Sequence, residues 1–158
     1  MIQFGREHMM ADTSLLKTVV EPYVCGVLQQ EYGRPFGPKR LTLASGGSHE
    51  FDAVSDDGQN VASVKAASGR TSGGNNPSGK IKDAEAELYY LTLANGTERI
   101  LVVTDPEFYE ILTRRLRGRL ASGLSLKLVP LPLEIMIQVQ KIRNWASAEV
   151  SPVNRLAE

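Results

Sequence analysis

The chain has 158 residues, of which 18 are basic and 18 acidic, so its formal net charge is zero. With 42% hydrophobic residues, the composition is typical of a folded globular protein and excludes a disordered or fibrous one. A neutral chain is not attracted to nucleic acid as a whole, so any contact with DNA or RNA needs a local basic patch. One cysteine and two histidines are too few for a zinc site, and we expect Cys25 to be buried and structural.

We expect neither a membrane span nor a signal peptide in this sequence. No run of about 18 apolar residues occurs, which is the length that a membrane-spanning helix needs. The first ten residues also lack the apolar core of a secretory signal. The sequence therefore predicts a cytoplasmic protein.

The ends of the chain differ in composition from its middle. Residues 1–11 are expected to be disordered, and the true start of the chain could be Met9 or Met10. Residues 12–150 predict a single domain, and residues 151–158 a loose C-terminal tail.

A first amphipathic helix is predicted from about residue 12 to Gly33. The sequence Asp-Thr-Ser at 12–14 offers N-caps, and apolar residues then recur at spacings of three and four. Pro22 either kinks this helix or opens a second one, and both readings keep Glu21 near its middle.

Residues 49–65 predict a β-hairpin that carries an acid and a lysine. Two strand-like runs flank the turn Asp-Asp-Gly at 56–58, and a short strand at 40–44 precedes them. Side-chain alternation places Glu50, Asp52 and Val54 on one face of the first strand, and Ser63 and Lys65 on one face of the second. Lys65 lies in a small, apolar strand and needs a partner or an opening to solvent, unless this is an edge strand whose lysine blocks aggregation.

The remaining segments alternate between helix and strand. A glycine-rich loop at 68–79 separates the hairpin from a helix at 80–95, and a continuous β-branched run at 99–104 predicts a buried strand. A helix from Pro106, a strand at 124–129 and a helix at 133–146 follow. The order α-β-β-β-α-β-α-β-α predicts an α/β fold with a mixed central sheet flanked by helices.

Asp52, Lys65 and the turn between them resemble the PD-(D/E)XK, or restriction-endonuclease-like, nuclease superfamily. The similarity covers roughly residues 14–105 and implies an αβββαβ core, here with an extra C-terminal β-α; the layout also resembles archaeal Holliday-junction resolvases. It implies a metal-dependent DNA endonuclease in which Asp52 holds Mg²⁺ or Mn²⁺ and Lys65 positions the attacking water. The glutamate that such proteins often carry on the first helix would be Glu21.

Ser63 departs from this family pattern, which has an acid two residues before the lysine. Phe51 also replaces the proline that precedes the aspartate in the family. Because a hydroxyl is a poor ligand for a hard cation, either another acid supplies the charge or the site is inactive. The acids available as substitutes are Glu21, Glu50, Asp83 and Glu85.

Two functions follow from this departure. The first is a DNA endonuclease whose metal ligands are Asp52, Glu21 and Glu50, with Ser63 at the catalytic site. The second is a catalytically inactive nuclease-fold module that binds nucleic acid or a protein partner.

No histidine and aspartate accompany Ser63 in the way a nucleophilic serine needs, so it is interpreted as a spacer. His49 is either a proton-transfer or supporting group beside Asp52, or a solvated loop residue. A third possibility is a structural hairpin in a different α/β arrangement.

Basic side chains gather in two places that could contact phosphates. The loop and helix start carry Arg70, Lys80 and Lys82, and the densest run contains Arg114, Arg115, Arg117 and Arg119. The alternatives are a plain surface loop and a solvated helix end. The last helix covers the sheet or forms a homodimer face, and no small-molecule cofactor is expected.

Overall fold

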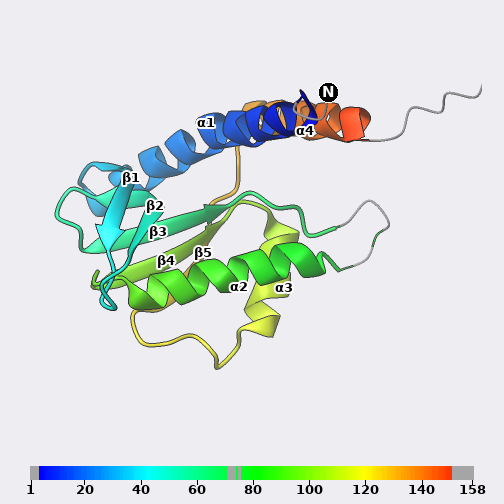
Figure 1. Ribbon diagram of the computed structural model, residues 1–158. Coiled ribbons are helices and arrows are strands. Elements are labelled where there is room, and N and C mark those ends of the chain that lie inside the picture. The colour runs from blue at the N-terminus through cyan, green and yellow to red at the C-terminus, as the bar shows by residue number, and fades with distance from the viewer. Residues whose placement is uncertain (1–3, 71–73, 75, 151–158) are drawn as a thin grey trace, which may run out of the picture. The chain divides into compact units, whose positions relative to one another are not determined.

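The computed structural model describes residues 4–70, 74 and 76–150, with backbone alone for residues 4–15 and 146–150. Its helices and strands follow the predicted order (Figure 1). In chain order they are α1 (Phe4–Tyr32), β1 (Phe36–Thr42), β2 (Ser48–Ser55), β3 (Asn60–Lys65), α2 (Ser78–Leu93), β4 (Glu98–Val103), α3 (Pro106–Arg115), β5 (Leu124–Leu128) and α4 (Leu133–Val150). The α/β class with a mixed sheet is therefore confirmed. No helix in the described part of the chain combines the length and apolarity that crossing a membrane requires.

Several boundaries differ from the prediction. The first helix begins at Phe4, so residues 4–11, for which no structure was expected, are helical, and the N-cap signals at 12–14 lie inside it. Pro22 also lies within α1, which continues to Tyr32. β1 begins at Phe36, four residues earlier than predicted. Apolar spacing identifies the amphipathic middle of a helix better than its ends. The residues at which helices begin and end are therefore hard to predict from sequence.

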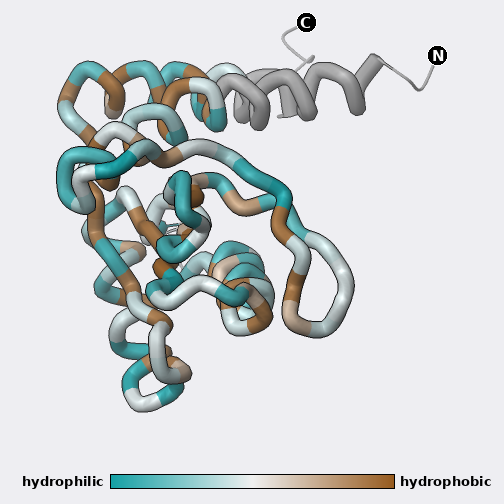
Figure 2. The backbone as a smooth tube through the Cα atoms, turned by 90° about the vertical axis from the view of Figure 1, so that its left-hand side faces the viewer, coloured by the Kyte–Doolittle hydropathy of each residue, from teal (hydrophilic) through white to brown (hydrophobic). Residues whose placement is uncertain are grey.

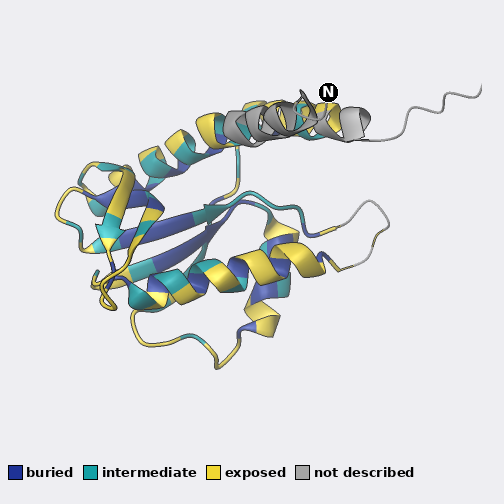
Figure 3. Ribbon diagram, in the orientation of Figure 1, coloured by how far each residue is buried: buried dark blue, intermediate teal, exposed yellow. Residues whose placement is uncertain are grey.

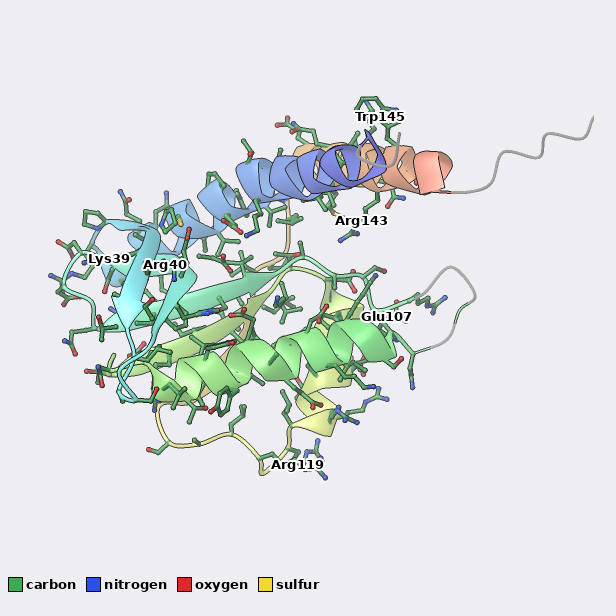
Figure 4. The ribbon with its side chains drawn as sticks, in the orientation of Figure 1. Lys39, Arg40, Glu107, Arg119, Arg143 and Trp145 are labelled. Carbon is green, nitrogen blue, oxygen red and sulfur yellow. The ribbon has the colours of Figure 1, made fainter. Side chains whose placement is uncertain are left out.

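Contacts divide the chain into two compact units. In the described part, the first unit contains residues 4–22 and 131–150, which form the start of α1 and all of α4. Large apolar side chains of α4 are exposed, namely Leu133, Met136, Ile137 and Trp145 (Figure 4). The role of α4 as a dimer face stays a prediction. The second unit contains residues 23–130 and the whole sheet.

The sheet has five strands in the order β1-β2-β3-β4-β5. β1, β2 and β3 form an antiparallel meander, whereas β3, β4 and β5 are parallel and are linked by α2 and α3. β3 is thus paired on both sides. The interpretation of its lysine as protection of a sheet edge is wrong, because the edges are β1 and β5.

Helices cover the sheet of the second unit on both faces (Figure 1). On one face, side chains of α2 and α3 pack with Leu101 and Val103 of β4 in the main apolar core. Ile100 and Val102 alternate with them and are buried on the opposite face, where residues 23–32 of α1 lie (Figures 1 and 3). Brown and teal segments follow one another along the chain in Figure 2, as expected for helices that bury one side.

A β-bulge interrupts β2 at Asp52. Gly37 of β1 pairs with Val54, but Lys39 pairs with Phe51, so two steps along β1 match three along β2. The extra residue reverses the alternation, and Phe51 and Val54 both join the core on the α2 side. The prediction that Glu50, Asp52 and Val54 share one face was wrong for this reason.

Candidate functional site

Asp52 lies in this bulge and faces the backbone of the neighbouring strand. Its carboxylate Oδ2 accepts a hydrogen bond of 2.7 Å from the N–H of Val64 in β3. The Sγ of Cys25 donates to the backbone carbonyl of Asp52 at 3.7 Å. Cys25 is half-buried rather than fully buried as expected, and its structural role stays a prediction. The bulge therefore aims Asp52 at the middle of β3.

A second carboxylate, Glu87 of α2, reaches the residue next to Val64. Ser63 is fully buried, and its Oγ donates a hydrogen bond of 2.8 Å to Oε2 of Glu87. Asp52 and Glu87 are thus bound to consecutive residues of one strand. The serine that departs from the expected sequence pattern is the residue that holds this glutamate.

His49 supports the same carboxylate from the start of β2. Its Nε2 lies 3.3 Å from Oε2 of Glu87, and its ring stacks on Tyr90 with centroids 3.9 Å apart and planes at 5°. Phe51 adds an edge contact at 4.8 Å. A half-buried strand residue held on three sides is not a solvated loop histidine, so that interpretation was wrong. His49 fixes the position of Glu87.

Lys65 follows at the end of β3 and is half-buried. It lies on the same side of the strand as Ser63, by alternation, and therefore on the side of α2. In the part of the chain that the structure describes, no carboxylate forms an ion pair with it. The cluster thus combines two carboxylates with an ammonium group that neither of them neutralises.

The other predicted metal ligands lie elsewhere. Glu50 is exposed and pairs with Arg40 of β1 at 3.8 Å. Glu21 belongs to the terminal unit, so its role beside Asp52 stays a prediction. Of the substitutes on α2, Asp83 is exposed and Glu85 pairs with Arg115 of α3. Of these acids, Glu50, Asp83 and Glu85 form no hydrogen bond with Ser63 or Val64.

Three of the predicted phosphate-binding arginines are already paired with acids. Arg70 contacts Glu107 at 2.7 Å, Arg114 contacts Glu110 at 2.6 Å, and Arg115 contacts Glu85. By contrast, Lys80 and Lys82 are exposed near the start of α2, whose first turn carries no acidic residue.

Glu87 was missed in the sequence, although a signal for it exists. The buried residues Ala84, Leu88 and Leu91 define the inner stripe of α2, and Glu87 falls between them at helical spacing. An acid at the margin of a buried stripe needs hydrogen-bond partners. Asp83 lies one helical turn before Glu87 on the same face of α2 but is exposed, whereas Glu85 lies on another face and pairs with Arg115.

The two carboxylates have the chemistry of a magnesium or manganese site. Mg²⁺ is commonly held by one or two carboxylates, with waters and substrate phosphates completing its shell. Oδ1 of Asp52 and Oε1 of Glu87 accept no hydrogen bond from any described residue. No cluster of three or more metal-binding side chains occurs in the described ranges.

Comparison with known proteins adds no assignment, since no family model, curated protein or solved structure matches the chain.

Proposed function

We propose that this protein is a metal-dependent phosphodiesterase that cleaves DNA, as the resemblance of its hairpin implies. One observation carries the proposal: two carboxylates are bound to consecutive residues of β3, and an unpaired lysine follows at the next position on that face. Perturbed or unneutralised charges at a strand end are typical of catalytic sites. Glu87 takes the role of the acid that the sequence lacks at position 63.

The residues would hold a divalent cation through the free oxygens of Asp52 and Glu87. A bound Mg²⁺ or Mn²⁺ supplies charge stabilisation and lowers the pKa of a water molecule. Ser63 and the N–H of Val64 orient the two carboxylates, and His49 keeps Glu87 from rotating away. Lys65 orients water and stabilises negative charge on the phosphate oxygens.

The test is cleavage of plasmid, branched and single-stranded DNA in Mg²⁺ and in Mn²⁺. Glu87→Gln keeps the shape of the side chain and an oxygen for Ser63 but removes the charge. We expect it to lower cleavage at least a hundredfold, as removal of an electrostatic stabiliser does. Glu50→Gln is the matched control, because Glu50 lies on the same hairpin, is exposed and pairs with Arg40. Equal activity of Glu87→Gln and wild type would refute the role of Glu87.

A second candidate is a nuclease-fold module that binds nucleic acid without cleaving it. The observation in its favour is that Oε2 of Glu87 already contacts both Ser63 and His49, as in a purely structural cluster. This candidate predicts DNA binding that is the same with Mg²⁺ and with EDTA, and no cleavage of any substrate. Metal-dependent cleavage that Glu87→Gln abolishes would exclude it.

A further inference from the structure

A concave surface lies on the side of α2 opposite Glu87. This hollow of about 300 Å³ lies between α2, α3 and the turn that precedes β5, and Leu88, Leu120 and Leu124 contribute its apolar part. Tyr89 of α2 and Arg119 of the turn also line it, and 63% of Tyr89 is exposed. The hollow therefore offers an aromatic ring and a guanidinium above an apolar floor.

A second hollow of similar composition adjoins the first. It has a volume of about 370 Å³ and contains Tyr109 and Arg117, and it shares Leu116, Leu120 and Leu124 with its neighbour. Each hollow thus has one tyrosine, exposed at Tyr89 and half-buried at Tyr109, and the first is lined by the paired Arg115 as well as by Arg119. The two lie on either side of the same short turn.

Arg117 and Arg119 differ from the other two arginines of the basic run. Arg114 and Arg115 form ion pairs with Glu110 and Glu85, whereas Arg117 and Arg119 are exposed and form none with any described acid. Figure 4 shows Arg119 extending from the turn below α2. Within this basic run, the charge left for a ligand is therefore that of Arg117 and Arg119, at the two hollows.

We propose that the two hollows bind successive nucleotides of a single-stranded nucleic acid. This inference rests on the proposed function, which makes nucleic acid the substrate. Bases stack on exposed aromatic rings without regard to sequence, and guanidinium groups pair with phosphates. A base must leave its duplex to reach Tyr89, so the site selects single strands.

The hollow at Tyr89 is connected to the candidate active site through aromatic contacts. Tyr89 contacts Tyr90 edge-on at 5.9 Å, and Tyr90 stacks on His49, which holds Glu87. The same turn of α2 therefore presents Tyr89 on one side and Glu87 on the other. A strand bound at the hollows would therefore lie across α2 from Glu87.

The test is fluorescence anisotropy with a labelled single-stranded oligothymidylate in EDTA, which prevents cleavage. Tyr89→Ala should weaken binding about 5- to 100-fold, and Tyr89→Phe should retain it, because stacking needs the ring and not the hydroxyl. Arg119→Ala should lower the slope of log affinity against log salt by about 0.7, the value for one phosphate contact on a single strand.

Lys39→Ala is the control, since it removes one exposed positive charge from β1, far along the chain from the turn (Figure 4). Equal losses from Lys39→Ala and Arg119→Ala would overturn the proposal, because they would show general attraction between charges. A duplex of the same sequence that binds as tightly, or a poly-glutamate peptide that competes equally well, would also overturn it.

Failure of this inference differs from failure of the proposed function. Glu87→Gln should bind the oligonucleotide as wild type does and yet not cleave it. If wild type cleaves DNA but Tyr89→Ala binds unchanged, the hollows are not the binding site. If binding depends on Tyr89 but no substrate is cleaved, the proposed catalytic function alone is wrong.

Discussion

Charged side chains form ion pairs at the turn of the β2–β3 hairpin, whereas the lysine at its open end does not. At the turn, Arg34 pairs with Asp56 and Asp57, and Asp57 also accepts hydrogen bonds from Ser55 at 2.6 Å and from the N–H of Gln59. At the open end, Lys65 has no acidic partner in the described part of the chain. The charges at the turn stabilise the hairpin, whereas the ammonium group at the open end can interact with a ligand.

This difference separates charges that stabilise the fold from charges that can act on a ligand. An isolated ion pair at the surface contributes little to stability, but a network such as Arg34 with Asp56 and Asp57 contributes more. A half-buried ammonium without a partner costs free energy, and proteins keep such groups mainly where function needs them. Substitutions at the two ends should therefore have opposite effects on stability and activity.

The largest expected effect is on catalysis at the open end. Lys65→Met should lower metal-dependent DNA cleavage about 100- to 1,000-fold, because it removes the charge that stabilises the phosphate oxygens. Its melting temperature should stay the same or rise, since no ion pair is lost. Arg34→Met at the turn should do the reverse, lowering stability while cleavage stays as in wild type. Parallel thermal melts and cleavage rates of both variants measure this, and loss of stability in Lys65→Met would contradict the comparison.

The next largest effect is expected on stability at Gly69, in the loop that follows β3. A Cβ at Gly69 would lie 2.6 Å from Cγ of Glu107 and 2.7 Å from the backbone nitrogen of Phe108, and its own N–H donates to Asp105. Gly69→Ala should therefore destabilise the protein by about 1–3 kcal/mol through overpacking. Gly79→Ala is its control, because nothing lies within 4 Å and α2 gains from alanine. Denaturant unfolding compares the two, and equal stabilities would show that Gly69 is not confined.

A smaller effect should appear at the turn in acid. The hydrogen bond from Ser55, then that from the N–H of Gln59, and the charge of Arg34 lower the pKa of Asp57 from its ordinary 3.8. A lowered folded pKa gives stability that is present above the unfolded value and is lost as the pH falls through the folded one. Asp57→Asn should remove this part of the acid dependence, so stability profiles of variant and wild type should converge below pH 4. Parallel profiles from pH 3 to 7 would contradict this.

The smallest effect involves Tyr32, which anchors the end of α1. Burial, followed by its hydrogen bond of 2.8 Å to Glu98, raises the pKa of Tyr32 from 10.0 to about 12. A raised folded pKa gives stability that is complete below the unfolded value and is lost as the pH rises toward the folded one. Wild type should thus lose stability relative to Tyr32→Phe between pH 10 and 12. Spectrophotometric titration of the tyrosines checks the shift directly, and an ordinary pKa would contradict it.

The order of helices and strands could be predicted because each of them has a recognisable local sequence pattern. Apolar spacing marks the helices, the Asp-Asp-Gly turn marks the hairpin, and the β-branched run marks β4. The bulge at Asp52 was not predictable in this way, because it arises from the pairing of β2 with β1. The prediction of which hairpin residues share a face of the sheet was wrong at this bulge.

The sequence identified the candidate-site residues on β2 and β3 but not the glutamate on α2. Asp52, Ser63 and Lys65 were identified from spacing within the hairpin, which the chain itself keeps short. Glu87 lies 24 residues after Ser63, and only the packing of α2 on the sheet brings the two together. Tertiary contacts also decide which arginines are neutralised, so Arg114 and Arg115 could not be separated from Arg117 and Arg119 by sequence.

Calorimetric titration with Mn²⁺ tests most directly whether Asp52 and Glu87 form one metal site. We predict saturable binding to wild type and to Glu50→Gln, and its loss in both Asp52→Asn and Glu87→Gln, with all four proteins folded by thermal melting. Wild-type affinity in Glu87→Gln, or no saturable binding to the wild-type protein, would contradict the account.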